Sequence, residues 1–586
     1  KPLDKWIVAA LTNQWLTDNI TNNVVQVNVV GEKKSFVLLP NGTYARPLGS
    51  ASELTDTGAG TFRLTTPKKI QYNFNAAGDI ATVVYPQGVT VTYTYTSGNL
   101  TSVTNGLGRT LTLAYTGSRL NSVSDGNGRS VSFTVDGSVN LTQLTDANGK
   151  FTVYEYDQPG RMTKTYLPAN PATALFTNVY DTLNRVKEKQ DAYGNVTTFY
   201  LAGTRAEERD AAGFSDVLYL DKNGSPVRSI NKVGKETKTV YDGQSRPIKV
   251  TQSEGNYVEL TYDINNYILT TKSVAKSGSG LSDIKNSFTY DARENKVATA
   301  VDGLGRTTTY TWNATTGTLT SVQQPVIGGF TPTTSFTYNA RGQRLTATDP
   351  TGIVTQINYH ASLERIESIV NDQGAGRKNL TTGFGYDTVG NVTSVTDPLT
   401  RVFGLSYDNL RRRTQATAPT PFGFITKFTF DDNGNNVKVE KQTSDPGAPW
   451  QTSSATYFVD NLVQSDTNPE GKTSTVSYTN RRQAWKKTDP LSRVIELSYD
   501  SAGRKSTLKD EALATAMTFT YTDNGLVASV KDTNNNTTQL DYDGFDRLNK
   551  TTFPDTSYTQ NSSYDANGNV LVFRMRSGNT ITNTFD

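Results

Sequence analysis

Apolar and polar residues alternate along short segments that recur throughout the chain. Val131, Phe133 and Val135 alternate with serine and threonine, and the segments 495–499 and 517–521 repeat the pattern. Successive side chains of a β-strand point to opposite faces, so a two-residue period indicates a strand with one buried face. The pattern therefore predicts many short strands, and most of them end at a tyrosine.

A second kind of segment follows each tyrosine and breaks this alternation. Its apolar residues are three positions apart, as in Leu100 with Val103 and Val392 with Val395. A step of three places two residues on one face only if the strand carries an extra residue. We therefore expect a β-bulge or a sharp twist there, which would curve the sheet.

Turn sequences separate the segments at two points in each unit. Strings such as NGLGR ending at Arg109, DGNGR at Arg129 and DGLGR at Arg306 combine an Asx side chain with a glycine. The Asx oxygen accepts backbone hydrogen bonds within a reversal, and glycine adopts the positive φ that the turn needs. Two turns in each unit imply two antiparallel strands in each unit.

Comparison of the chain with itself reveals a repeat of roughly 21 residues, marked by a Tyr-Asp pair. Tyr241 and Tyr262 are 21 residues apart, as are Tyr386 and Tyr407. Because a catalytic pair occurs once whereas these pairs recur, we interpret them as structural elements in which tyrosine packs and aspartate caps the turn. The pairs are Tyr156-Asp157, Tyr180-Asp181, Tyr241-Asp242, Tyr262-Asp263, Tyr290-Asp291, Tyr386-Asp387, Tyr407-Asp408, Tyr499-Asp500, Tyr542-Asp543 and Tyr564-Asp565.

The repeats predict an all-β fold in which about 24 units form one long antiparallel strip. Open twisted sheets rarely exceed ~10 strands, so a strip of about 48 strands must wind on itself into a hollow shell, or cocoon. A parallel β-helix is disfavoured by the two reversing turns in each unit. A propeller of ~42-residue blades would need about twelve blades, more than the usual four to eight.

The first 70 residues lack the period. Trp6, Ile7, Trp15 and the apolar run 24–30 suggest a few irregular strands or a short helix, which we interpret as a cap on the first edge of the array. The predicted organisation is a cap over residues 1–70 and repeats over 71–586, with the array expected to continue past Asp586. Longer spacings place extended loops at 273–280, near Asn371 and after Lys441.

Composition offers little material for catalysis. The chain has no cysteine and a single histidine, His360, which stands at a repeat position, so thiolate or histidine metal sites and a Ser-His-Asp triad are disfavoured. We expect no enzyme activity, no cofactor and no metal, and any signal peptide would lie outside this sequence. No run of 18 apolar residues occurs, so no membrane span is expected.

Charge is nearly balanced, with 58 Lys and Arg against 55 Asp and Glu, so nothing indicates a nucleic-acid partner. The turn arginines, such as Arg109 and Arg185, are expected to pair with aspartates or carbonyl groups of neighbouring repeats. The one basic run, Arg411 to Arg413, is a weak phosphate-binding signal, and we interpret it as a solvated face.

Units such as YDTLNRVKEKQDAYGNVTTFY from Tyr180 and YDSAGRKSTLKD from Tyr499 resemble the RHS/YD-repeat family, over about residues 71–586. The resemblance implies a β-strip spiralling into a cocoon. In bacterial members, including Tc toxin C components, polymorphic toxins and wall-associated proteins, the cocoon encloses a C-terminal toxin, and in teneurins a similar shell serves adhesion. Asp349-Pro350-Thr351-Gly352 matches the letters of the family's self-cleavage motif, but it stands at an ordinary mid-repeat turn and is not expected to be cleaved.

The function expected from the resemblance is the structural shell of a secreted or cell-surface bacterial protein. Its partner would be its own C-terminal effector, outside this sequence. The alternative is a secreted or cell-surface adhesin or filament module that binds glycan or protein partners. The ligand-binding residues of either function are unknown from the sequence.

Overall fold

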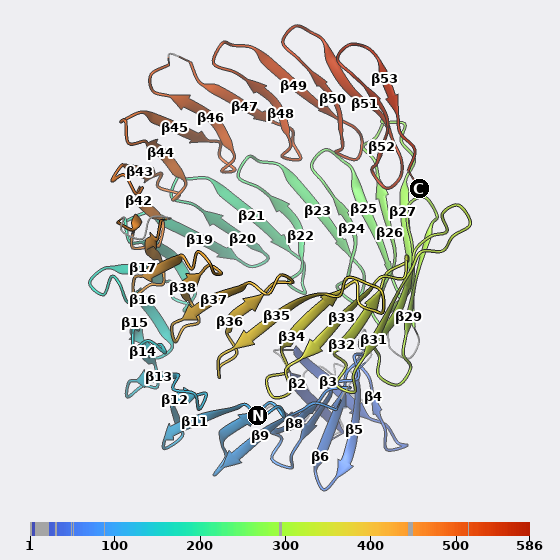
Figure 1. The fold of residues 1–586 in the computed structure, drawn as a ribbon, viewed down its shortest axis with the longest axis vertical. Helices are drawn as coiled ribbons and strands as arrows, with labels where there is room; N and C mark the ends of the chain where they lie inside the picture. Colours follow the sequence, from blue (N-terminus) through green and yellow to red (C-terminus); the bar gives the residue numbers. More distant parts are fainter. Residues whose placement is uncertain are drawn as a thin grey trace.

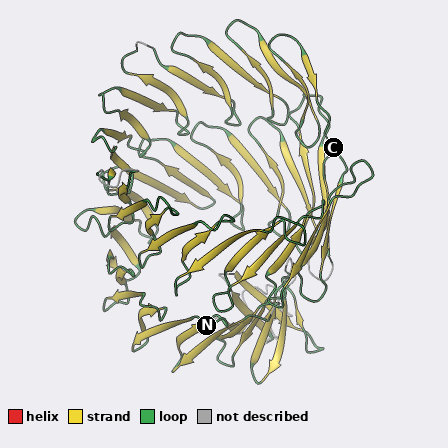
Figure 2. Cartoon of the chain, in the orientation of Figure 1, coloured by secondary structure: helices red, strands yellow, loops and turns green. Residues whose placement is uncertain are grey.

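The computed structural model describes residues 3–5, 23–29, 32–47, 50, 52–86, 88–291, 296–443, 449–513 and 515–585. These residues form strands joined by turns and loops (Figures 1 and 2). No helix occurs among the described residues, so the predicted all-β class is confirmed. Trp6, Ile7 and Trp15 lie outside the described residues.

The strands of the first half of the chain are β1 (Leu3–Lys5), β2 (Val24–Val29), β3 (Glu32–Leu38), β4 (Tyr44–Ala45), β5 (Glu53–Gly58), β6 (Thr61–Thr65), β7 (Gln71–Phe74), β8 (Ile80–Val84), β9 (Thr90–Thr96), β10 (Asn99–Thr104), β11 (Thr110–Thr116), β12 (Arg119–Ser124), β13 (Ser130–Val135), β14 (Leu141–Thr145), β15 (Phe151–Gln158), β16 (Arg161–Tyr166), β17 (Ala174–Tyr180), β18 (Val186–Asp191), β19 (Val196–Ala202), β20 (Arg205–Arg209), β21 (Ser215–Leu220), β22 (Pro226–Ile230), β23 (Glu236–Tyr241), β24 (Pro247–Thr251), β25 (Tyr257–Tyr262), β26 (Ile268–Val274) and β27 (Ile284–Tyr290).

Those of the second half are β28 (Val297–Val301), β29 (Thr307–Trp312), β30 (Leu319–Gln323), β31 (Thr333–Tyr338), β32 (Arg344–Thr348), β33 (Val354–Tyr359), β34 (Ile366–Asn371), β35 (Leu380–Tyr386), β36 (Val392–Thr396), β37 (Val402–Tyr407), β38 (Arg413–Thr417), β39 (Ile425–Phe430), β40 (Asn436–Lys441), β41 (Gln451–Tyr457), β42 (Val463–Thr467), β43 (Thr473–Tyr478), β44 (Ala484–Thr488), β45 (Val494–Tyr499), β46 (Lys505–Asp510), β47 (Met517–Tyr521), β48 (Val527–Lys531), β49 (Thr537–Tyr542), β50 (Leu548–Thr552), β51 (Tyr558–Tyr564), β52 (Val570–Arg574) and β53 (Thr580–Thr582).

The strands from β5 to β53 form one strip in which each strand pairs antiparallel with the next. Antiparallel pairing at every step, for example β23 with β24 and β24 with β25, excludes the parallel β-helix. No pairing among the described residues joins β53 back to β5, so the strip remains an open ribbon. Strands β5 and β6 already belong to it, before the predicted boundary at residue 70, which stays a prediction.

Bulges recur where the spacing of apolar residues predicted them. The register shifts just before the tyrosine, for instance between Gly385 and Tyr386, because the facing strand carries one extra residue at Thr393. The extra residue returns Val392 and Val395 to one face. The predicted bulge is therefore confirmed in most units, whereas β19 and β20 pair without a register shift.

The strip has two rims. Turns that follow odd-numbered strands, such as 242–246 between β23 and β24, form the Tyr-Asp rim. Turns that follow even-numbered strands, such as 252–256 between β24 and β25, form the mid-repeat rim. Because every connection is a hairpin, each repeat contributes one turn to each rim.

Winding of the strip brings the two rims together (Figure 1). Asn148, after β14, donates a 3.2 Å hydrogen bond to Asp408, after β37, and Asn567, after β51, donates one of 2.7 Å to Asp302, after β28. Both contacts join turns that are 23 strands apart (β14 and β37, β28 and β51). At ~4.8 Å per strand, one winding measures about 110 Å around, a radius of about 18 Å that strand tilt widens further.

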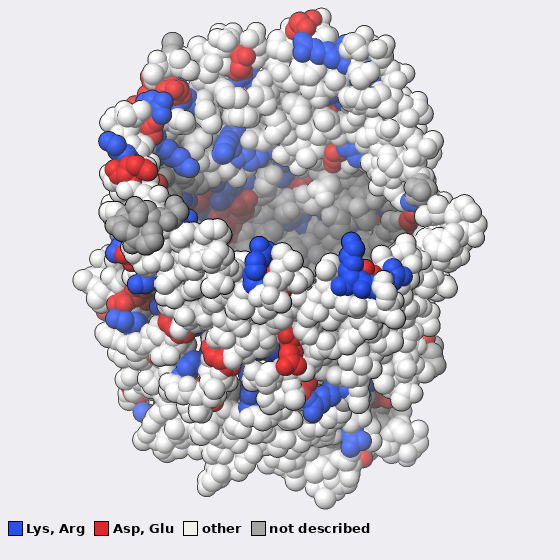
Figure 3. All heavy atoms as spheres, viewed as in Figure 1, with Lys and Arg blue, Asp and Glu red and all other residues white. Residues whose placement is uncertain are grey.

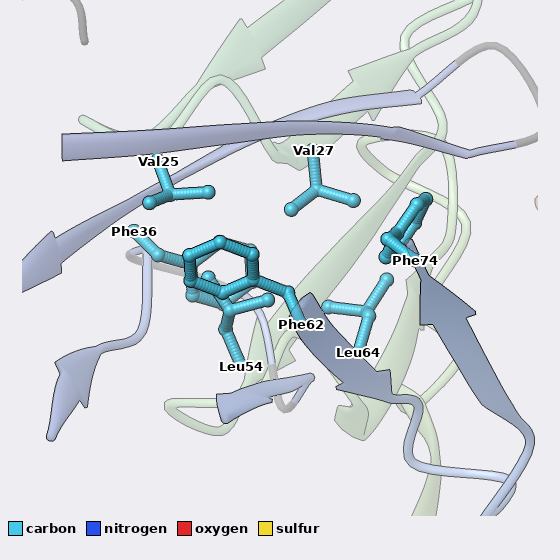
Figure 4. Close-up of a cluster of buried hydrophobic side chains, with 7 residues drawn as sticks. All are labelled: Val25, Val27, Phe36, Leu54, Phe62, Leu64 and Phe74. Carbon is cyan, nitrogen blue, oxygen red and sulfur yellow. The ribbon is translucent and has the colours of Figure 1, made fainter. Parts of the chain in front are cut away.

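A separate four-stranded sheet, β1 to β4, covers the beginning of the strip. Its Val25, Val27 and Phe36 pack against apolar side chains of β5, β6 and β7 (Figure 4). The side chains of the strip in this cluster are Leu54, Phe62, Leu64 and Phe74. This packing buries one face of the first three strands of the strip, as expected of a cap on a repeat array, although the cap role itself stays a prediction.

The tyrosine hydroxyl groups join neighbouring hairpins at the Tyr-Asp rim. Strands β24 and β25 pair only as far as Lys249 with Glu259, so the ladder stops short of Pro247. The hydroxyl of Tyr262 donates a 2.8 Å hydrogen bond to the carbonyl of Pro247 across this opening. The same bond recurs from Tyr499 to Ala484 at 2.6 Å and from Tyr542 to Val527 at 2.9 Å. A phenol is needed here because an unpaired backbone carbonyl is costly once water is excluded.

Removal of one such hydroxyl should therefore destabilise the strip. We expect Tyr499→Phe to lower the free energy of unfolding by about 1 kcal/mol, because one hydrogen bond to a backbone carbonyl is lost. Tyr200→Phe, at a tyrosine that is 45% exposed, is the matched control and should change little. Guanidinium denaturation of the two variants measures the difference, and equal midpoints would contradict the role of the hydroxyl.

Candidate functional site

Most Tyr-Asp turns use the aspartate in the same way. In the turn after β23, Asp242 Oδ1 accepts hydrogen bonds from the backbone N–H groups of Gln244 and Arg246, at 2.8 and 3.1 Å. Its Oδ2 accepts one from Arg246 Nε at 2.7 Å. The same bonds to the residue four positions on, arginine or asparagine, are made by Asp181, Asp387, Asp408, Asp500, Asp543 and Asp565.

The arginine that closes one turn also reaches the next repeat. Arg246 Nη1 donates to the carbonyl oxygen of Asp263 at 2.9 Å, and its guanidinium lies 4.8 Å from the ring centroid of Tyr262. Arg547 contacts Asp565 and Tyr564 in the same way. These side chains therefore link successive hairpins, as well as closing their own turn.

The Tyr-Asp pairs are distributed singly along a rim and are not gathered into one pocket. In two of the remaining predicted pairs the aspartate also accepts hydrogen bonds within its turn, but from partly different groups. Asp157 binds Arg161 at 2.7 Å, and Asp263 accepts backbone hydrogen bonds from Asn265 and Tyr267. Beside Asp291, residues 292–295 lie outside the described residues. These contacts support the interpretation of the pairs as structural elements.

His360 stands in the place of the aspartate in its own turn. Its Nδ1 accepts hydrogen bonds from the backbone N–H groups of Ser362 and Leu363, at 3.4 and 3.3 Å. Asp349, in the sequence that matches a cleavage motif, accepts bonds from the N–H groups of Thr351 and Ile353, both at 2.9 Å. Both residues thus perform the turn-closing task of the repeat.

The contact between windings is a continuous surface that we call the seam. It joins the mid-repeat rim of residues 105–306 to the Tyr-Asp rim of residues 387–569. At one point Asp210 forms ion pairs with Lys232 at 3.1 Å and with Arg481 at 2.9 Å, beside a cavity of about 570 Å³. At another, Arg482 lies 3.9 Å from the ring centroid of Tyr193.

The loop expected at 273–280 lies in the seam. The backbone N–H of Lys276 donates to the carbonyl of Gly544 at 2.9 Å, and its ammonium forms ion pairs with Glu254 and, at 2.6 Å, with Asp546. Asn524 also donates to Asp546, at 2.8 Å. This role could not be seen in the sequence, because Gly544 and Asp546 are about 270 residues away and no local pattern marks them. Of the loop after Lys441, residues 444–448 lie outside the described residues.

The windings surround a hollow. Figure 3 shows an opening between the front wall, β31 to β37 in Figure 1, and the strands above it, with charged side chains on the wall behind. The described chain exposes 32360 Å², whereas a compact monomer of 64.0 kDa exposes about 20,000 Å². A large excess of exposed area is typical of a wall one sheet thick that presents both faces to solvent.

No group of three or more His, Cys, Asp or Glu side chains within the described ranges is arranged to hold a metal ion. A search of the same residues for a helix long and apolar enough to cross a membrane found none.

Comparisons with known proteins agree with this architecture. The family model of the RHS repeat matches residues 74–110, 386–421 and 521–558. A search of the curated proteins found no match.

Two solved structures share the fold. The crystal structure of TcdB2-TccC3-Cdc42 matches with a TM-score of 0.51 at 12% identity, over 95% of this chain and 35% of that chain. The pore of the Photorhabdus luminescens Tc holotoxin, with a substituted TccC3, matches with a TM-score of 0.52 at 13% identity, over 95% and 35%. This chain thus spans about a third of the length of these relatives.

Removal of the lysine at the centre of the seam should open it. We expect Lys276→Met to lower the free energy of unfolding by about 2–3 kcal/mol, because Glu254 and Asp546 are left close together without a cation. The Lys276 side chain is only 19% exposed. Lys272→Met, at a more exposed ion pair with Asp283, is the control and should cost no more than about 0.5 kcal/mol. Equal losses in denaturant titrations would contradict the special role of the seam.

The seam should also weaken in acid. Burial alone would raise the pKa of Asp302, but hydrogen bonds from Asn567, Arg306 and the N–H of Leu304 outweigh it and lower this pKa from 3.8 to about 2. Because the folded-state pKa is depressed, the stabilisation is complete above about pH 4 and is lost as the pH falls towards 2. We therefore expect Asn567→Ala to cost about 1–2 kcal/mol at pH 6 and progressively less below pH 4.

Denaturant titrations of the wild type and of Asn567→Ala at a series of pH values measure this difference. A cost that stays constant down to the lowest pH at which the wild type remains folded would show that the bond does not depend on the charge of Asp302.

Proposed function

The chain belongs to the RHS/YD-repeat family, and from this premise we propose that its β-shell encloses an effector domain that lies outside these 586 residues. The fold itself is that of a structural shell. We further propose that the protein is secreted or displayed at the surface of a bacterium, a proposal supported by its likeness to a component of the Photorhabdus luminescens Tc holotoxin.

The observation that carries this proposal is the hollow bounded by the two windings (Figure 3). A winding of 23 strands (β14 to β37) has a radius of about 18 Å before tilt. A folded domain of 100 residues has a radius of about 17 Å as a solid sphere. Half of a ~10 Å sheet layer reduces the free radius to about 13 Å, which is smaller than such a domain. Strand tilt of ~35–45° or further windings must therefore enlarge the hollow before it can enclose one.

The wall is also suited to separate a cargo from the surrounding solution. Ion pairs across neighbouring strands neutralise charges on the wall from β22 to β27, as in Arg228 with Glu236 and Lys272 with Asp283. Paired charges keep a surface hydrated without a strong field of one sign. Such a wall would contact a cargo without binding it tightly.

One observation favours the alternative, an adhesin or filament module that binds glycan or protein. The mid-repeat rim of the second winding is not covered by other described residues and exposes apolar side chains. Phe422 is 70% exposed and stacks on Phe424, and Leu399 and Leu491 are 70% and 71% exposed. Exposed apolar groups in a row are typical of binding surfaces.

Cryo-electron microscopy of the full-length gene product decides between the two functions. We expect density inside the windings that the repeats do not explain, and limited proteolysis should spare that segment until the seam is opened by Lys276→Met. Lys272→Met is the control that should leave the segment protected. An empty hollow, with ordered partner density on the rim at Phe422, would overturn encapsulation and support the alternative.

A further inference from the structure

The three arginines of the basic run 411–413 have different surroundings. Arg412 Nε donates to Asp408 at 2.7 Å and closes its own turn. The guanidinium of Arg413 lies 4.7 Å from the ring centroid of Phe428. Arg411 instead extends into the seam, where its Nη2 donates to the carbonyl of Val389 at 3.1 Å. Arg411 is exposed, in keeping with the interpretation of the run as a solvated face, but this interpretation does not account for its contact with Val389.

Two further arginines reach the same point. Arg109, from the first winding, donates from Nη1 to the same carbonyl of Val389 at 3.3 Å. Arg109 Nη2 and Arg365 Nε both lie 2.6 Å from the point where a Cβ on Gly390 would stand. Gly390 has a φ of 82°, and the absence of its side chain leaves the space into which these groups point.

This cluster has more positive than negative charge. Among the residues that the structure describes, no carboxylate lies within 4 Å of a nitrogen of Arg109, Arg365 or Arg411. The nearby Arg129 is already paired with Asp125 at 2.5 Å. Asp387 is close, but its oxygens accept hydrogen bonds from the N–H groups of Val389 and Asn391 and from the Asn391 amide.

Two properties of the cluster favour the binding of an anion. Arg109 Nη2 is buried and makes no hydrogen bond to any described residue. Burial, together with repulsion from Arg129, Arg365 and Arg109, lowers the pKa of Arg411 below its usual value. A buried guanidinium N–H without an acceptor is unfavourable, and so is a group of like charges.

Each of the three arginines is unpaired because its turn departs from the repeat. The turn of Arg109 begins with Asn105, and that of Arg365 begins with His360, where most turns have an aspartate that neutralises the arginine. Arg411 occupies the positive-φ position, at 63°, that glycine takes in many turns. Three separate departures, far apart in the sequence, meet at one point of the seam. Departures from a local rule that converge in space are typical of functional sites.

We propose that Arg109, Arg365 and Arg411 form a binding site for a small tetrahedral oxyanion, of which inorganic phosphate is the representative. The oxyanion accepts hydrogen bonds from guanidinium groups of both windings, including the free N–H of Arg109. Arginine presents several N–H groups in a planar fork that matches phosphate and sulfate oxygens. The bound anion links the first winding to the second. The concentration of free anion therefore regulates the stability of the seam.

Isothermal titration calorimetry with inorganic phosphate, in about 0.15 M sodium chloride to screen unspecific attraction, tests the site. We expect one phosphate per chain with a dissociation constant of about 1 mM or lower. Sodium sulfate should compete, whereas additional chloride should compete only weakly, because it offers a single acceptor atom.

The decisive variant is Asn105→Asp, which restores the carboxylate of the repeat and supplies Arg109 with an internal partner. It should fold, because Asn105 Oδ1 already accepts the turn bonds from Leu107 and Arg109 that an aspartate would accept. We expect phosphate affinity to fall about tenfold or more, since a charge-assisted hydrogen bond and a net positive charge are lost.

Asn468→Asp is the matched control. Asn468 begins an equivalent turn, accepting bonds from Glu470 and Lys472, on the rim away from the seam. The Asn468→Asp variant should bind phosphate as tightly as the wild type. Arg109→Gln gives a second variant that should lose binding and, unlike Asn105→Asp, should not gain an internal ion pair. The absence of saturable binding in the wild type, or equal binding in Asn105→Asp and Asn468→Asp, would overturn the proposal.

Discussion

The structure depends on the contact between one winding of the strip and the next. A sheet that is one layer thick has no second layer against which to bury a face, and outside the cap few side chains are fully buried. The rims would otherwise present rows of turns to water. Winding turns the rims into an interface, at which Asn148, Asp302 and Lys276 find partners about 270 residues away. The hollow is the geometric consequence of this interface.

Polar groups therefore provide much of the stabilisation that a hydrophobic core provides in a compact domain. In most turns the aspartate accepts two backbone N–H groups and binds the side chain four residues on, as Asp242 does with Arg246. The tyrosine hydroxyl satisfies a carbonyl that the ladder leaves open, as Tyr262 does for Pro247. Each bond contributes only about 1 kcal/mol, but the repeat multiplies it along the strip.

Because the same turn recurs along the strip, the turns that lack its aspartate are informative. Where a repeat keeps its aspartate, its arginine is neutralised and belongs to the wall, as with Arg246 and Asp242. Two turns have Asn105 or His360 in place of this aspartate. Their arginines, Arg109 and Arg365, have no carboxylate partner within the turn and extend towards the seam. A position that departs from the pattern is therefore a better guide to specific chemistry than the abundant Tyr-Asp pairs.

The sequence by itself determined the strands, the two turns in each repeat, the bulge and the need to wind. All of these follow from contacts within about 25 residues, such as the three-residue spacing of Val392 and Val395, so the local pattern carries the information. The loop 273–280 and Arg411 could be located in the sequence, but their roles could not, because Asp546 and Arg109, which they meet in the seam, lie about 270 and 300 residues away. Only the tertiary structure decided these, since the 23 strands of one winding (β14 to β37) bring Lys276 to Asp546 and Arg411 to Arg109. That number is set by curvature accumulated over the whole strip, which no single repeat encodes.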